Sequence, residues 1–195
     1  MKSNDTLVQT LPIGGNAALR NIMLAVVGSL ALWLSAKIQV PFYPVPMTMQ
    51  TFVVLVIGMA FGWRLGGATI LLYLAEGAVG LPVFAGTPER GIGLAYMMGP
   101  TGGYLVGFFF SALVVGWLAE RGWDRRVIPT LAAMVAGTAI IFALGVLWLG
   151  AFIGWDQPVL DLGLVPFLPG AAFKIALAAA VLPAIWRLVD RDRRA

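Results

Sequence analysis

The 195-residue chain contains neither cysteine nor histidine. Their absence excludes disulfides, thiol nucleophiles, imidazole acid–base chemistry and the usual Cys/His sites for transition metals. The sequence also lacks a G-x-x-x-x-G-K-S/T motif with which to bind and hydrolyse ATP. We therefore expect a chain with no metal site and no cofactor of its own.

Charged residues are scarce as well. They make up 11% of the chain, whereas hydrophobic residues make up 60% and the mean hydropathy is +0.91. Soluble domains hold roughly 25% charged and 45–50% apolar residues, so this composition predicts an integral membrane protein. Because one membrane span takes about 20 residues, the chain has room for a single domain of short spans and for no large soluble domain.

The apolar residues fall into six segments, which predict an all-α, compact bundle of six transmembrane helices over residues 1–195. The expected spans are residues 22–40, 47–63, 65–79, 104–119, 127–153 and 167–189. Several of them are short, so structured outer loops or neighbouring helices must cover their ends. Trp63 and Arg64 are expected to form a tight turn between the second and third spans.

The basic residues predict the orientation of the bundle. Ten of the 13 lysines and arginines fall in the two tails or in the second and fourth connections. Under the positive-inside rule, both termini and these two connections are cytoplasmic, and the other three connections lie outside. The ten are Lys2, Arg20, Arg64, Arg121, Arg125, Arg126, Arg187, Arg191, Arg193 and Arg194.

The mixed, polar start of the chain predicts a retained cytoplasmic tail rather than a signal peptide. The basic excess predicts contact with anionic membrane lipid rather than with nucleic acid, because no basic patch is interleaved with aromatic side chains on which bases could stack.

The first outer connection has three prolines between residues 41 and 46, which forbid a helix and predict a stiff, extended loop. Thr48 follows and can cap the next helix. Alternatively, Thr48 and Gln50 face a small polar ligand, since a hydroxyl and a carboxamide can each donate and accept hydrogen bonds. Gln50 is the more informative of the two, because a buried amide without partners is costly.

The long outer connection, residues 80–104, interrupts the apolar sequence with many glycines and prolines. Backbone of this kind must be covered by protein or face a watery cavity when it lies at membrane depth. Its aromatic residues, Phe84 and Tyr96 among them, can form the wall of a pocket for an apolar ring system. Arg90 either binds an anion there or is an ordinary solvated loop residue.

Three ionisable residues lie inside the apolar segments. Such charges are expensive in a membrane and suggest a function, although those near helix ends can extend to the membrane surface. Lys37 is near an end. Lys174 either binds an anion or pairs with Glu76 or a backbone carbonyl, and Glu76 either pairs with a lysine or contacts the ligand. Together with the outer loops, these residues predict a pocket for a small, partly apolar, anionic molecule taken from outside.

Small residues recur at a spacing of four in the first span, as Ala25 and Ser29 and as Ala31 and Ser35. This spacing permits close helix packing, either within the bundle or against an external partner. Self-association into a homo-oligomer stays open.

The residue types favour binding and transport over catalysis. The chain has no histidine or cysteine and only one carboxylate inside a span, so we expect no enzyme activity. The remaining alternatives are a solitary ion-coupled carrier and a binding subunit that depends on an energising partner. Ion-coupled carriers usually hold several embedded acids and internal repeats, which favours the binding subunit here.

Four segments give the chain a resemblance to a known family. They are PVPMTMQT (44–51), GLPVFAG (80–86), GPTGGY (99–104) and PFLPG (166–170), the last followed by Lys174. In this order they resemble BioY, the family of biotin-capturing S components of energy-coupling-factor (ECF) transporters.

The resemblance implies six helices in a bacterial cytoplasmic membrane and a biotin site under the first and third outer loops. It also implies partnership with a transmembrane coupling (T) subunit and with two ATPase subunits that hydrolyse the ATP. Ala31 and Ser35 would meet the coupling subunit. Biotin-binding residues would be drawn from Thr48, Gln50, Glu76, Phe84, Arg90, Tyr96 and Lys174.

One position departs from the family pattern. Members often carry an acid three residues before the lysine of the last motif, where this chain has Ala171. The acid would accept hydrogen bonds from the ureido N–H groups of biotin. In this chain Gln50, Glu76 or a backbone carbonyl must take that role.

Overall fold

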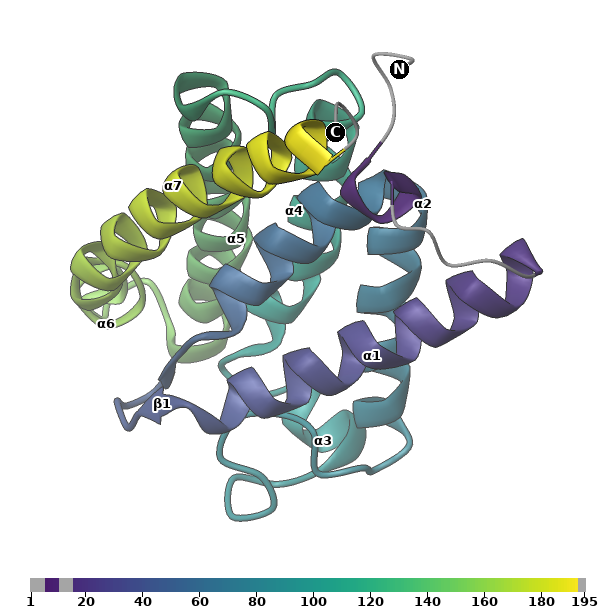
Figure 1. Ribbon diagram of the computed structural model, residues 1–195. Helices are drawn as coiled ribbons and strands as arrows, with labels where there is room; N and C mark the ends of the chain where they lie inside the picture. Colours follow the sequence, from purple (N-terminus) through teal and green to yellow (C-terminus); the bar gives the residue numbers. More distant parts are fainter. Residues whose placement is uncertain (1–5, 11–15, 193–195) are drawn as a thin grey trace.

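The structure, a computed structural model, describes residues 6–10 and 16–192. Its long helices are α1 (Ala17–Lys37), α2 (Gln50–Ala78), α4 (Gly102–Ala119), α5 (Val127–Ile153) and α7 (Leu168–Asp192). Among the described residues, five helical segments are long and apolar enough to cross a membrane. The predicted all-α membrane fold is therefore confirmed (Figure 1).

Short elements connect these helices at their ends. Strands β1 (Gln39–Val40) and β2 (Met47–Thr48) form a small antiparallel hairpin between α1 and α2. The residues predicted as the end of the first span and the start of the second therefore form strands, because the prolines between them prevent a helix. The remaining short elements are η1 (Leu7–Thr10), α3 (Gly93–Met97), α6 (Val159–Gly163) and η2 (Val165–Phe167).

The second and third predicted spans form one element, α2, which bends sharply (Figure 1). The bend lies at Gly62, with φ 78° and ψ 174°, and not at the Trp63–Arg64 turn that the sequence suggested. Only glycine adopts this backbone conformation readily, because it has no Cβ to clash. When the two arms of α2, residues 50–61 and 63–78, are counted separately, the described residues form six long helical segments, the number predicted.

The bend is held against α4. The carboxylate of Glu120 accepts a hydrogen bond from Trp63 N–H at 3.3 Å, at the start of the second arm. A Cβ on Gly116 would lie 2.5 Å from Trp63 N and 2.6 Å from Gly62 C. The backbones of α2 and α4 therefore approach at a distance that only a glycine in α4 permits.

We expect Gly116→Ala to lower the free energy of unfolding by about 1–3 kcal/mol, the usual cost of overpacking a tight contact, because the clash is with backbone atoms. Thermal unfolding in detergent measures the loss. Gly170→Ala is the matched control, since an added Cβ there meets nothing within 4 Å. Equal stability of the two variants would contradict this account of the bend.

Helix α4 packs between α2 and α5, while α7 packs on α5. Helix α1 lies against α2 and leaves an apolar face exposed, which includes Ile22, Val27 and Leu34. The short helix η1 and the last turn of α7 lie at one end of the molecule (Figure 1). We call the opposite end, with the β1–β2 hairpin and α3, the outer end, following the predicted orientation.

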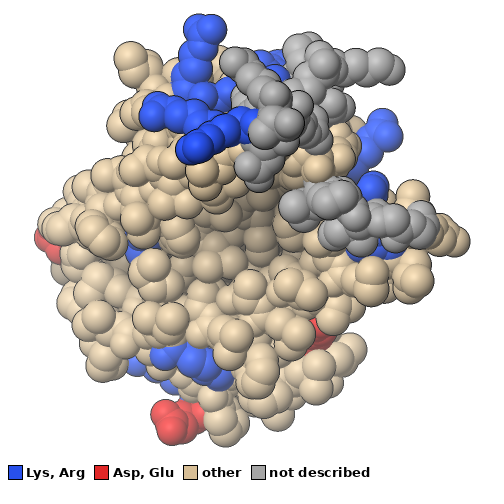
Figure 2. All heavy atoms as spheres, in the orientation of Figure 1, with Lys and Arg blue, Asp and Glu red and all other residues tan. Residues whose placement is uncertain are grey.

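In the face that Figure 2 shows, most of the lysine and arginine atoms lie at the end of the molecule where α7 ends, and a smaller group lies at the outer end. This distribution agrees with the charge asymmetry on which the orientation was predicted. Residues 1–5, 11–15 and 193–195 lie outside the described part of the chain. Much of the predicted cytoplasmic tail therefore lies outside the described residues. So do three of the basic residues used for the orientation: Lys2, Arg193 and Arg194.

A buried carboxylate anchors the end of α7 near the termini. Trp186 Nε1 donates to Asp124 Oδ2 at 2.5 Å, and the guanidinium of Arg125 lies 4.5 Å from the centre of the Trp186 ring. Asp124 Oδ1 is buried without a hydrogen-bond partner among the described residues. Burial raises the pKa of Asp124 from its ordinary value of 3.8 to about 6, although the Trp186 hydrogen bond and Arg125 act to lower it.

This raised pKa predicts a pH dependence of stability. Between roughly pH 4 and pH 6 the folded state keeps a proton on Asp124 that the unfolded state has lost. The contribution of Asp124 to stability therefore falls as the pH rises through this window, by at most about 1.4 kcal/mol per pH unit. Melting temperatures measured from pH 4 to pH 7 should show less decline in Asp124→Asn than in the wild type. Parallel pH profiles would contradict the assignment.

Candidate ligand-binding site

A cavity of about 60 Å³ lies at the outer end, enclosed by β2, α3, η2 and parts of α2, α4, α5 and α7. We call it the central cavity. One side is aromatic and apolar and includes Tyr96, Tyr104, Leu105, Phe108, Phe142 and Phe167. The polar groups are Thr48, Gln50, Thr51, Thr101, Thr138 and Lys174. A mostly apolar pocket with a few converging polar groups is the usual form of a small-molecule site.

Lys174 is the cation of the central cavity. Its Nζ donates hydrogen bonds to Thr48 O at 2.5 Å and to Thr51 Oγ1 at 2.9 Å, which joins the first turns of α7 to the start of α2. An ammonium group has three N–H donors, so these two bonds leave one for a ligand. The sequence left three partners open for Lys174: an anion, Glu76 and a backbone carbonyl. In the structure Lys174 pairs with a backbone carbonyl, that of Thr48.

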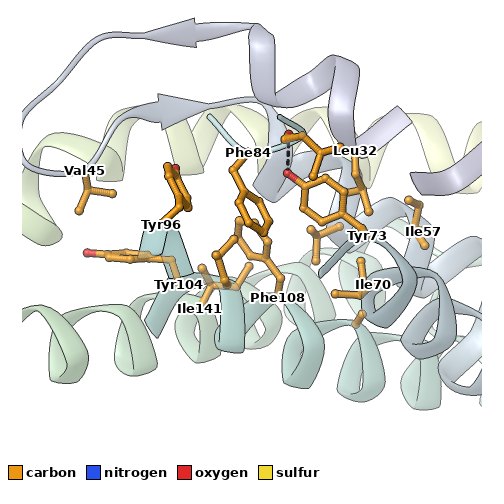
Figure 3. Close-up of a cluster of buried hydrophobic side chains, with 14 of the residues drawn as sticks. Leu32, Val45, Ile57, Ile70, Tyr73, Phe84, Tyr96, Tyr104, Phe108 and Ile141 are labelled. Carbon is orange, nitrogen blue, oxygen red and sulfur yellow. Dashed lines mark hydrogen bonds between the residues drawn. The ribbon is translucent and has the colours of Figure 1, made fainter. Parts of the chain in front are cut away.

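Gln50 belongs to a buried hydrogen-bond chain. Its Nε2 donates to Tyr73 OH at 2.6 Å. Tyr73 OH in turn donates to Val83 O at 2.9 Å, the bond that the dashed line at Tyr73 marks in Figure 3. The amide nitrogen of Gln50 is thereby used, and its Oε1 has only a long contact of 3.4 Å with the Thr48 hydroxyl. An amide oxygen has two acceptor positions, so Gln50 can still accept from a ligand N–H.

Thr48 has a double role at the start of α2. Met49 occupies the N-cap position, yet Thr48 Oγ1 accepts from Gln50 N–H at 3.2 Å. The prediction that Thr48 caps the helix was therefore wrong in its position, although its hydroxyl accepts from the N–H of the first helical residue. The same side chain lines the central cavity, so a contact of Thr48 with a ligand stays a prediction.

The aromatic wall comes from the long outer connection. Tyr96 lines the central cavity, and Phe84 stacks behind it with ring centres 4.9 Å apart and an angle of 18° between the planes (Figure 3). Phe84 is fully buried and meets Tyr73 edge-on at 5.5 Å. A Cβ on Gly77 would lie only 2.0 Å from the Phe84 ring, so glycine is required where this ring sits on α2. Phe84 therefore positions Tyr96 and does not itself line the cavity.

Two cations at the outer end, Arg90 in the long connection and Lys37 at the end of α1, bind loop carbonyls. The Arg90 guanidinium donates to Phe42 O at 3.4 Å and to Pro44 O at 3.5 Å, which ties the long connection to the first one. Lys37 Nζ donates to Pro82 O at 3.0 Å and to Phe84 O at 3.2 Å. Neither residue lines the central cavity. In this structure both hold the backbone of loops that cover the site.

Glu76 lies apart from the central cavity. Its carboxylate accepts a hydrogen bond from the Ser29 hydroxyl, across the α1–α2 contact. Both residues line another cavity, of about 260 Å³, together with Trp33 and Pro82. In the structure Glu76 joins α2 to α1 through its hydrogen bond with Ser29. A role of Glu76 in ligand binding stays a prediction.

The two residues predicted to meet a partner differ in exposure. Ser35 is buried, and its hydroxyl donates to Leu32 O at 2.8 Å within α1. Ala31 is half-buried at the edge of the exposed face of α1. The interface role of this pair stays a prediction, with Ala31 the more accessible of the two.

The comparisons with known proteins agree with the sequence motifs. A sequence model of the BioY family matches residues 4–191. The chain belongs to the BioY family. It is 36% identical to a biotin transporter BioY of Thermotoga maritima over 163 residues, which is 84% of this chain and 94% of that protein. It is 38% identical to a biotin transporter BioY of Rhizobium etli over 156 residues, 76% of this chain and 82% of that protein.

A solved structure supports the fold of this BioY-family chain. It is described as the S component for biotin from an ECF-type ABC transporter, and it matches with a TM-score of 0.72 at 20% identity. The match covers 90% of this chain and 95% of that one. At this identity the likeness establishes the all-helical architecture.

Several lining residues of this BioY-family chain were not predicted as site residues. Phe167 is one of them, although it lies inside a family motif. Tyr104 was expected only as one of the aromatic residues of the long outer connection, and its hydroxyl donates to Gly163 O at 2.6 Å. Thr138 and Phe142 come from one face of α5, four residues apart. Their signal is weak in the sequence, because a threonine in a membrane helix can bond its own backbone and a phenylalanine can face lipid.

A double-mutant cycle tests the link between Lys174 and Thr51 in the ligand-free chain. Thr51→Val removes the acceptor and keeps the shape, and Lys174→Met removes the ammonium. We expect Thr51→Val to cost about 1.5–3 kcal/mol in the wild type, the range for hydrogen bonds to charged groups, and much less when Lys174 is already Met. Thermal unfolding in detergent measures both costs. Additive effects of the two substitutions would show that the hydrogen bond contributes no stability.

Proposed function

We propose that the chain captures biotin at the outer face of a bacterial cytoplasmic membrane and takes it up as the S component of an ECF-type ABC transporter. The observation that carries this proposal is the central cavity, in which Lys174 stands opposite an aromatic wall and beside Thr48 and Gln50. Biotin has the matching parts: a carboxylate on an apolar chain, and a bicyclic ring with a ureido group. Membership of the BioY family supports the same ligand.

The chemistry of the cavity suggests one orientation for biotin. Its carboxylate binds Lys174 Nζ, and its rings lie against Tyr96 and Tyr104. A lysine placed in an apolar environment is costly without a partner, so it has more to gain from an anion than from a carbonyl oxygen. Arg90 is a weaker candidate for the carboxylate, because its guanidinium is bonded to loop carbonyls and does not line the cavity.

The ureido N–H groups need an acceptor on the protein. Ala171 lines the central cavity, so the position where relatives often carry an acid faces the ligand but has no polar atom to offer. Gln50 Oε1 is the acceptor we propose in its place, because Glu76 lies at a different cavity. Gln50 is held in place by Tyr73, and a fixed acceptor loses little entropy on binding.

The cavity must widen for this ligand to enter. Its volume of about 60 Å³ is far below the roughly 300–1,000 Å³ of typical small-molecule sites. The side chains of Lys174 and Phe167 are the boundary we expect to move. Exchange of Thr48 O for the biotin carboxylate would shift Lys174 and at the same time release its bond to the first outer connection.

The proposal includes an energising partner. The chain has no ATP-binding motif, so uptake against a gradient would depend on a coupling T subunit and two ATPase subunits. The exposed apolar face of α1 beside Ala31 is the surface we assign to the coupling subunit.

We expect Lys174→Ala to weaken the binding of biotin at least 30-fold and that of biotin methylamide only a few-fold. The difference arises because loss of one partner of a buried charge pair costs about 2–5 kcal/mol, whereas the amide is uncharged. Calorimetry or ligand-fluorescence titration of the purified chain gives both affinities. Arg90→Ala is the control and should affect the two ligands equally. Equal losses for both ligands in Lys174→Ala would refute the carboxylate contact.

Uptake of radiolabelled biotin tests the proposed function as a whole. Cells that make the chain together with the coupling and ATPase subunits should accumulate biotin faster than cells that make the chain alone, and a Walker-motif variant of the ATPase should abolish the difference. Uptake that ignores the partners and follows a proton gradient would instead identify a solitary ion-coupled carrier. Failure of the purified chain to bind biotin would exclude both.

A further inference from the structure

A second cavity, of about 300 Å³, adjoins the central one. Thr48, Phe167 and Lys174 line both, so these three side chains form the partition between the cavities. We call the second one the side cavity. It lies between the β1–β2 hairpin and the first turns of α7, with Met47 on one wall and Phe173 on the other.

The walls of the side cavity are mostly apolar. Beyond the partition they consist of Ile38, Val40, Met47, Met49, Gly170 and Phe173, with Gln39 as a further polar residue. No second lysine or arginine lines the side cavity, and no carboxylate does among the described residues. A charged group would lose its hydration there without gaining a partner, whereas an alkyl group would gain from burial.

Because Lys174 lines both cavities, a ligand bound to it lies next to the side cavity. A carboxyl or carbonyl oxygen bound to Nζ stands at the partition, because Lys174 lines both cavities. Any group attached to that carbonyl carbon on the side away from the rings must then continue past the partition. The side cavity is the space that receives it.

We propose that the site also binds carboxyl-extended derivatives of biotin, namely amides and esters with a short apolar group, and that this group occupies the side cavity. The carbonyl oxygen of such a ligand accepts from Lys174 Nζ in place of the carboxylate. This inference rests on the proposed function and adds a ligand class to it. No bond is made or broken, so the derivative binds intact.

A length series tests the proposal. The purified chain is titrated in detergent with biotin, biotin methylamide, biotin butylamide and an amide of equal length that ends in a carboxylate. Burial of a methylene contributes about 0.8 kcal/mol, which is roughly a fourfold gain in affinity for each added CH₂ until the cavity is full. We expect the butylamide to bind tighter than the methylamide, and the carboxylate-terminated amide to bind more weakly than the butylamide.

Gly170 allows the side cavity to be filled without distortion. An added Cβ at Gly170 meets nothing within 4 Å, and the residue lies in the first turn of α7. We expect Gly170→Leu to weaken the butylamide at least tenfold and to leave biotin and the methylamide within about twofold. Gly170→Ala is the matched control and should leave all three affinities near the wild type. Val40→Trp fills the same cavity from β1 and replaces Gly170→Leu if that variant does not fold.

The outcomes separate this inference from the proposed function. Tight binding of biotin with a flat length series would overturn the inference and leave the function intact. The inference would also be overturned if Gly170→Leu lowered the affinity for biotin and for biotin butylamide by the same factor. Repeating the series in lipid vesicles tests lipid as the competing occupant: a length effect that disappears in the vesicles assigns the side cavity to a lipid chain and overturns the proposal for the membrane. Lack of binding by biotin itself would refute the proposed function.

Discussion

The outer half of this protein depends on one ammonium group placed inside an apolar bundle. No carboxylate of the described residues lines the central cavity with Lys174, whose ammonium is held by a carbonyl oxygen of β2 and a hydroxyl oxygen of the first turn of α2. Because a charge at membrane depth must find such partners, this contact fixes α7 against the first outer connection. The same contact places the cation where a ligand carboxylate can replace the carbonyl. In the proposed function, one atom, Lys174 Nζ, therefore serves both the structure and the binding of the ligand.

Close backbone contacts at glycines place the other walls of the site. Gly62 and Gly116 bring α2 and α4 together, Gly77 seats Phe84 behind Tyr96, and a Cβ on Gly145 would lie 2.3 Å from the Tyr104 ring. In lipid, helices gain little from apolar burial and associate through such close packing. Some glycines of this chain thus form close contacts that support the aromatic wall, and others, such as Gly86 and Gly91, take a positive φ in the outer loops.

The helices could be predicted from the sequence, and so could the polar residues that line the candidate site, whereas the contacts within the outer loops could not. Hydropathy located the spans, and polar residues in apolar segments, Thr48, Gln50 and Lys174, were recognisable because each needs a partner there. Arg90 carries the same charge as Lys174, yet it bonds loop carbonyls, and this depends on loop geometry that no spacing reveals. Thr138 lines the cavity because its face of α5 is turned toward it. Which face of a helix is turned inward depends on how the helices pack.

A structure of the chain bound to biotin tests the central claim most directly, because the claim concerns which atom meets the ligand carboxylate. The account predicts a carboxylate oxygen within hydrogen-bond distance of Lys174 Nζ, the rings against Tyr96 and Tyr104, and a longer separation between Lys174 Nζ and Thr48 O than the 2.5 Å seen here. A carboxylate bound to Arg90, with Lys174 still on Thr48 O, would contradict it.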